Sequence, residues 1–81
     1  MNISMYEIHD KLKLSLIETN KGWRIRVLLE FNGKVYEERY PIQDIKEYRA
    51  LDEEDLSKYH EFVKQYMGFK IADKIKNQKK G

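Results

Sequence analysis

Apolar and polar residues alternate along the first half of the chain in three successive runs. The run over residues 12–18 places three leucines on one side, and the run over residues 23–31 places five apolar residues there. Such period-two alternation is typical of half-buried β-strands. A third run extends from about Lys34 to Tyr40, and Pro41 favours an edge strand or the end of a strand at that point. The pattern therefore predicts three strands.

The segments between these runs carry turn residues that fix how the strands pair. Asn32-Gly33 is typical of a two-residue type I′ turn, and residues 19–22 (TNKG) fit a four-residue loop. These loop lengths place the apolar sets of all three strands on one face. A shift of one residue would turn one strand over, so the two turns support each other. We predict an antiparallel β-meander.

The second half of the chain shows helical spacing. The acids at 52–55 are typical of a helix start, where the helix dipole favours negative charge. An apolar stripe follows, made of Leu56, Tyr59, Val63, Tyr66, Met67 and Ile71. We expect Gly68 to mark a bend or a helix end, and residues 42–51 to contain one helical turn. The sequence predicts one domain over residues 1–75 and a basic, flexible tail over 76–81.

Residues before the first strand fit a helix better than a fourth strand. Ser4-x-x-Glu7 matches a capping box, and Met5, Ile8 and Leu12 share one helix face. The predicted fold class is α+β: a three-stranded antiparallel β-meander with a long C-terminal helix packed on one face and a short N-terminal helix. The other face of the sheet stays open.

Basic residues collect on this open face in the predicted register. Arg26 lies directly opposite Arg39, Arg24 is the next residue on that side, and Lys13 and Lys21 flank the three arginines. Like charges in opposite positions are destabilising unless something offsets them. A guanidinium fits phosphate or the edge of a guanine, and a β-ribbon can enter the major groove of DNA. These five residues are the candidate nucleic-acid-binding site.

The overall charge limits this hypothesis. Charged residues make up 37% of the 81-residue chain, but the net charge is only +2, so an electrostatic function must come from local clustering. An alternative interpretation is that the arginines are solvated and reach Glu18 or Glu37. The expected partner of the arginines is either nucleic acid, with DNA favoured over RNA, or an acidic protein surface.

The arginine pattern also resembles a known family. Gly22-Trp23-Arg24-Ile25-Arg26-Val27, then Asn32-Gly33-Lys34, a third strand and a helix resemble the AP2-like arm-type domains of phage integrases. In that family a three-stranded sheet backed by a helix reads DNA, so the resemblance, over about residues 12–66, implies DNA binding through the sheet. Acidic residues stand where the family carries basic ones, at Glu37, Glu38 and 52–55. The element order also fits a double-stranded RNA-binding domain, but the Lys-rich start of its last helix is missing.

No motif in the sequence indicates catalysis, a cofactor or a metal. The chain has no cysteine, and its two histidines, His9 and His60, lack a third ligand at a suitable spacing. No nucleophile stands beside a base. No apolar run reaches the length of a membrane span, and the N-terminus does not resemble a signal peptide. We therefore expect a non-enzymatic, soluble, cytoplasmic protein.

The length of the predicted helix suggests a second class of function. A helix over residues 53–75 would be about 34 Å long, whereas a strand of seven to nine residues spans about 23–30 Å. The overhanging end is expected to expose four apolar side chains, Phe69, Ile71, Ala72 and Ile75. On this hypothesis the chain is a protein-binding module, such as a homodimeric adaptor or a small viral or mobile-element inhibitor of a host protein.

Two more expectations concern the space between sheet and helix. Glu38 falls on the apolar side of its strand, so it should lie at the helix margin and pair with a lysine. The chain is rich in aromatic residues, namely Trp23, Tyr36, Tyr40, Tyr59, Phe62, Tyr66 and Phe69, and most of them are expected to belong to this core.

Overall fold

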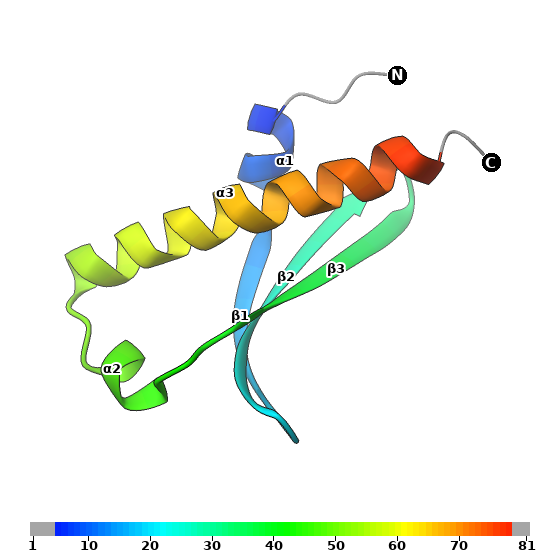
Figure 1. Ribbon diagram of the computed structural model, residues 1–81. Coiled ribbons are helices and arrows are strands. Elements are labelled where there is room, and N and C mark those ends of the chain that lie inside the picture. Colours follow the sequence, from blue (N-terminus) through cyan, green and yellow to red (C-terminus); the bar gives the residue numbers. More distant parts are fainter. Residues whose placement is uncertain (1–4, 79–81) are drawn as a thin grey trace.

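The computed structural model describes residues 5–78, which form three strands and three helices. The order of elements is α1 (Met5–Lys11), β1 (Lys13–Thr19), β2 (Gly22–Phe31), β3 (Lys34–Pro41), α2 (Ile45–Arg49) and α3 (Glu53–Gln78). The strands form one antiparallel sheet in the order β1-β2-β3, with the long helix α3 crossing it (Figure 1). The predicted α+β class, the β-meander and the short N-terminal helix are confirmed. The predicted capping box begins at Ser4, which lies outside the described residues.

Both hairpins close through two-residue turns. Asn32 and Gly33 have φ angles of 53° and 76°, the positive values that a type I′ turn requires and that Asn and Gly adopt most readily. The first turn is tighter than predicted, because Thr19 pairs with Gly22. The Thr19 hydroxyl donates to the Gly22 carbonyl at 2.8 Å and accepts from the Lys21 amide at 3.2 Å. Strands β1 and β2 therefore each extend one residue further toward this turn than predicted, and the register of the predicted pairs stays the same.

The predicted register of the sheet is confirmed. Arg26 pairs with Arg39 and Glu18 pairs with Trp23, so alternate residues of all three strands face α3. The centre of that face is the buried part of β2, formed by Ile25, Val27 and Leu29. Continued past Lys13, the predicted register also places Lys11 beside Glu30 on the open face; this is wrong, because Lys11 belongs to α1.

Helix α3 is continuous over its 26 residues. It begins where the Asp52 carboxylate accepts a hydrogen bond from the Asp55 amide at 2.8 Å, an N-cap contact that satisfies a free helix-end donor. Gly68 neither bends nor ends the helix, so that expectation is wrong; the residue lies buried inside α3. The helix also continues beyond the predicted boundary at residue 75 to Gln78, so the first part of the expected flexible tail is helical. Residues 79–81 lie outside the described residues.

Helix α3 contributes to the core from its middle to its C-terminal end. Its buried hydrophobic residues pack with α1 and β2 in one cluster and are Val63, Met67, Ile71, Ala72 and Ile75. The expectation that Ile71, Ala72 and Ile75 are exposed is therefore wrong, although Phe69 is 62% exposed. Helix α3 does extend past the sheet, as its length predicts, but it does so with its N-terminal half, toward α2 (Figure 1). Packing against α1 keeps the other half over the sheet.

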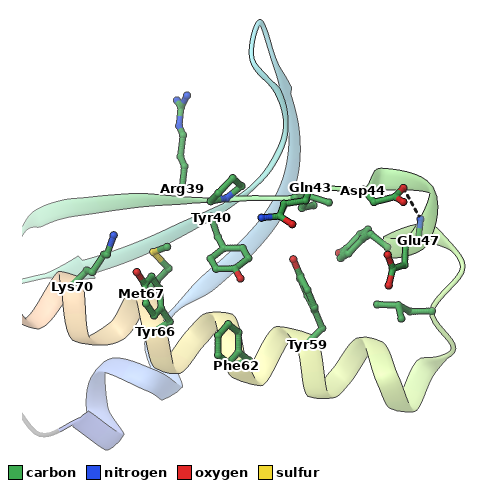
Figure 2. Close-up of a pocket in the computed structure, with 14 residues that line it drawn as sticks. Arg39, Tyr40, Gln43, Asp44, Glu47, Tyr59, Phe62, Tyr66, Met67 and Lys70 are labelled. Atoms are coloured by element: carbon green, nitrogen blue, oxygen red, sulfur yellow. Dashed lines mark hydrogen bonds between the residues drawn. The ribbon is translucent and has the colours of Figure 1, made fainter.

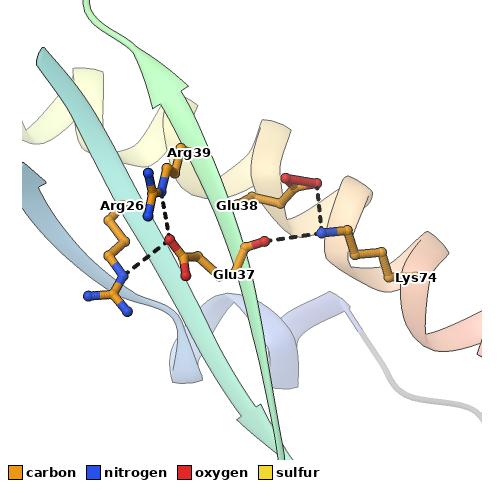
Figure 3. Close-up of polar contacts among 5 residues, drawn as sticks. All are labelled: Arg26, Glu37, Glu38, Arg39 and Lys74. Atoms are coloured by element: carbon orange, nitrogen blue, oxygen red, sulfur yellow. Dashed lines mark hydrogen bonds and ion pairs between the residues drawn. The ribbon is translucent and has the colours of Figure 1, made fainter. Parts of the chain in front are cut away.

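Two local contacts fix the elements at the margin of the core. Lys74 of α3 forms an ion pair with Glu38 at 3.3 Å, which confirms the predicted lysine partner (Figure 3). The Asp44 carboxylate caps α2 by accepting from the amides of Lys46 and Glu47, at 3.0 and 3.1 Å. The helical turn expected within residues 42–51 is thus confirmed.

None of the helices in the described part of the chain is long and apolar enough to cross a membrane.

Candidate functional site

The face of the sheet opposite α1 and α3 carries the basic residues singled out from the sequence. Arg26 and Arg39 are cross-strand partners, Arg24 pairs with Pro41 one row along, and Lys13 pairs with Leu28 in the other direction. We call Lys13, Arg24, Arg26 and Arg39 the arginine face. Lys21 lies exposed in the turn between β1 and β2. The structure thus brings four of the five candidate site residues to one side of the sheet, and Lys21 lies in the adjoining turn.

A single carboxylate lies between the two opposed arginines. Glu37 Oε2 accepts a hydrogen bond from Arg39 Nε at 2.7 Å and lies 3.3 Å from Arg26 Nε (Figure 3). This negative charge explains how β2 and β3 tolerate like charges in opposite positions. The contact with Glu37, which the alternative interpretation of the arginines expected, is therefore present.

The arginines still present donors to the outside. Both contacts with Glu37 use Nε, and the terminal nitrogens of Arg26 extend away from the carboxylate (Figure 3). Arg39 extends away from α3, on the opposite side of β3 from Tyr40 (Figure 2). Arg26 Nε itself is buried and makes no hydrogen bond within the described residues, because its contact with Glu37 is poorly aligned. Glu37 therefore orients the two side chains without using their outer ends.

The interaction with Glu37 should make stability depend on pH. The hydrogen bond from Arg39, together with the positive charges of Arg26 and Arg39, lowers the pKa of Glu37 below its ordinary value. A lowered folded-state pKa stabilises the protein at neutral pH, and this contribution disappears as pH falls through that pKa. Glu37→Gln should therefore cost stability near pH 7, and the difference from the unmodified protein should shrink as the pH falls through the lowered pKa of Glu37. Urea unfolding of the unmodified protein and of Glu37→Gln, from neutral to acidic pH, measures this difference in the free energy of unfolding. A difference independent of pH would contradict this role of Glu37.

A second surface feature lies beside α3, in a groove of about 700 Å³ between the end of β3, α2 and α3 (Figure 2). The ring of Tyr40 lies edge-on to three aromatic rings of α3, those of Tyr59, Phe62 and Tyr66, at 6.1 Å in each case. Phe62 and Tyr66 stack on each other with centroids 6.2 Å apart. The rim of the groove is charged, with Lys70 near one end and Asp44 and Glu47 near the other.

Most of the aromatic residues were expected in the core, and for Phe62 and Tyr66 this is wrong, whereas Phe69 is exposed, as expected. Phe62, Tyr66 and Phe69 are 53%, 46% and 62% exposed, whereas Tyr59 packs partly against the core. The sequence does contain a signal for this. Tyr59, Phe62, Tyr66 and Phe69 are spaced by three, four and three residues, which places them on a different side of the helix from Val63, Met67 and Ile71. We call these four residues the aromatic stripe.

Both histidines connect helices. His9 Nε2 of α1 lies 2.9 Å from a carboxylate oxygen of Glu61 on α3, and His60 Nε2 lies 2.8 Å from the hydroxyl of Tyr48 on α2. Burial lowers the pKa of His60, with a smaller effect from the charge of Lys64. Within residues 5–78, no group of three or more His, Asp or Glu side chains is arranged to hold a metal ion.

Comparisons with protein-family models, with curated proteins and with solved structures found no match to this chain. The resemblance to the arm-type domains therefore stays a prediction from the sequence. The function has to be inferred from the geometry of the arginine face and of the aromatic stripe.

Proposed function

We propose that this protein is a small, non-enzymatic nucleic-acid-binding domain whose arginine face contacts DNA. The observation that carries the proposal is the arrangement of Arg26 and Arg39 on an uncovered sheet face. The two guanidinium groups are held by one carboxylate through Nε. Glu37 therefore fixes the direction of both side chains before any ligand binds. Pre-ordering of this kind lowers the entropy lost when a long side chain binds.

The charges on this face favour an anionic ligand. Four basic side chains stand against two acidic ones, Glu30 and Glu37, and Lys21 adds a further positive charge at the hairpin tip. Phosphate oxygens accept hydrogen bonds from a guanidinium in its own plane, and lysines contact phosphates as point charges. The arginines are thus suited to phosphates or guanine edges, and Lys13 and Lys21 to flanking phosphates.

The shape of the face favours duplex DNA over duplex RNA. Neighbouring strands lie about 4.8 Å apart, so the backbone of three strands spans about 10 Å. The major groove of B-DNA is about 12 Å wide and accepts a β-ribbon. The major groove of A-form RNA is deep and narrow, and side chains do not read it. A sheet face with outward arginines therefore fits DNA better.

A binding titration tests this function. Labelled DNA duplex, single-stranded DNA and RNA duplex of matched sequence are each titrated with the full chain at about 50 mM and about 200 mM salt. We expect the tightest binding to duplex DNA and a steep loss of affinity at the higher salt, because phosphate contacts release counterions. Replacing Arg24 and Arg26 together with alanine should weaken this binding. Absence of binding at low salt to all three ligands would contradict the proposal.

A second candidate function is a protein-binding module that acts through α3. The observation that favours it is the aromatic stripe, in which three neighbouring rings are about half exposed or more. Contiguous exposed apolar surface is uncommon on monomers and marks interaction sites. A dimeric adaptor and an inhibitor of a host protein are both included in this candidate.

A further inference from the structure

We propose that the free edge of β1, together with the groove between β1 and α3, binds an extended segment of another protein as an additional antiparallel strand. The segment carries aliphatic side chains at alternate positions, with basic residues flanking them. This inference goes beyond both candidate functions, because it uses neither the guanidinium groups of the arginine face nor the aromatic stripe. Its failure would leave the proposed binding of DNA untouched.

The backbone of β1 presents hydrogen-bonding groups at an edge of the sheet. Alternate residues of an antiparallel strand direct both of their backbone groups to the same neighbour. The Ile42 amide donates to the Trp23 carbonyl at 3.0 Å, so the backbone of Trp23 is directed away from β1. Its partner Glu18 therefore directs its N–H and C=O away from β2, as do Leu14 and Leu16 at two-residue steps. Within residues 5–78 these groups have no backbone partner.

The other edge of the sheet, along β3, is blocked. Lys74 Nζ donates to the outward carbonyl of Glu37 at 3.1 Å, and Pro41 has no N–H to offer. Strand β1 contains no proline, and its centre, residues 14–17, carries no charge. Proteins usually block a strand edge with prolines, charges or a covering element. An edge without these features is suited to strand addition, in which the backbone of a bound segment supplies the missing partners.

A groove of about 460 Å³ beside this edge indicates which side chains the added strand carries. Leu12 and Leu14 line the groove from the β1 side, and Leu56 lines it from the N-terminal half of α3. Leu16 pairs with the buried Ile25, so it faces the same side, but it is 39% exposed. A strand added to β1 would place alternate side chains in this groove and over Leu16. Aliphatic side chains at these positions match the leucines.

A second copy of β1 is a poor occupant of this groove. The antiparallel register that pairs two β1 strands over their full length, and each shift of it by two residues, sets Glu18 of one copy opposite a leucine of the other. The facing wall carries Glu53 and Glu61 against one base, Lys64. Although His9 pairs with Glu61, Glu53 has no ion-pair partner among the described residues. A segment with a basic residue in place of Glu18 fits better.

A synthetic peptide tests the added strand. The probe is acetyl-Lys-Thr-Val-Thr-Val-Thr-Lys-amide, which in an extended conformation has its valines and lysines on one side and its threonines on the other. Adding the probe to the isotope-labelled full chain should shift the amide signals of Leu14, Leu16 and Glu18 and slow their hydrogen exchange. We expect a dissociation constant of about 1 mM or tighter.

Two methylated forms of the probe separate strand addition from non-specific binding. N-methylation of both valines removes the donors that face β1 in an antiparallel pair, whereas N-methylation of two threonines removes as many donors on the far edge. Only the first form should bind at least about tenfold more weakly than the probe. Equal binding of both forms would overturn the proposal, and weaker binding of the threonine form alone would overturn the antiparallel orientation.

Two variants of the protein locate the site. Leu16→Lys places a positive charge beside β1 and should weaken binding of the probe at least about tenfold. Val35→Lys adds the same charge at a 66% exposed position on β3 and should bind the probe like the unmodified chain. Circular dichroism confirms that each variant is folded. Equal binding by the three proteins, or no binding of the probe up to about 5 mM, would overturn the proposal.

Sedimentation velocity of the unmodified protein tests the alternative occupant. We expect a monomer at the concentrations used with the probe. A dimer in which the Leu14, Leu16 and Glu18 amides are protected without peptide would show that a second copy takes the β1 edge, and would overturn the proposed partner.

Discussion

Replacing Ile71 with alanine is expected to lower the free energy of unfolding by about 2–5 kcal/mol, the usual range for a buried aliphatic side chain. Ile71 is fully buried in the cluster between α3, α1 and the sheet. The loss combines the transfer free energy of the side chain with the cavity that remains. Small domains are stable by about 5–15 kcal/mol, so this change removes a large part of the total.

Phe69→Ala is the matched control, two residues earlier on the same helix. Its ring is 62% exposed, so the free energy of unfolding of the monomer should change by less than about 0.5 kcal/mol. Urea unfolding followed by circular dichroism at a low, fixed protein concentration measures both variants without a contribution from association. Similar small effects at both positions would show that the C-terminal half of α3 is exposed and that the packing described above is wrong.

Replacing Arg26 and Arg39 together with alanine should have the largest effect on binding to DNA. Each arginine that contacts a phosphate contributes about one unit to the slope of log affinity against log salt, so the slope should fall by about two units. Affinity for duplex DNA near 50 mM salt should fall by about 10- to 100-fold, corresponding to about 0.7–1.4 kcal/mol for each arginine. Fluorescence anisotropy at several salt concentrations gives both quantities.

Two variants separate a specific contact from a change in net charge. Lys46→Ala with Lys58→Ala removes the same two charges from α2 and α3, away from the sheet face, and should leave the salt slope nearly unchanged. Glu37→Gln keeps a side-chain oxygen that can accept from the arginine Nε–H groups but removes the negative charge between Arg26 and Arg39, so it should raise affinity at low salt. An equal loss of slope in the lysine variant and the arginine variant would show that binding follows net charge alone.

The sheet could be predicted from the sequence because its determinants are local. Alternation assigns each residue of β2 to a face, and Asn32-Gly33 fixes how β2 meets β3. The pairing of Arg26 with Arg39 follows from these two facts. The position of the Glu37 carboxylate between them does not, because it depends on a side-chain rotamer that reaches back to the neighbouring row.

The placement of α3 could be predicted only in part. The acids at 52–55 and the apolar spacing identify the helix, but which end passes beyond the sheet depends on non-local contacts with α1. The chain also carries two apolar patterns on one helix, and pattern alone does not say which is buried. Val63 and Met67 meet the sheet and α1, whereas Phe62 and Phe69 stay exposed. Burial at Gly68 likewise depends on tertiary contacts, which override the low helix propensity of glycine.

The most direct test of the central claim is to map the contact by nuclear magnetic resonance. Backbone amide and arginine Nε–Hε signals of the full chain are followed while a short DNA duplex is added at low salt. We expect the Nε–Hε signals of Arg24, Arg26 and Arg39 and the amides of the adjoining strand residues to shift in proportion to binding. Signals of Phe62 and Phe69 on α3 should stay in place. Shifts confined to α3, or no shift at the arginine face while DNA is bound, would contradict the proposal that this face binds DNA.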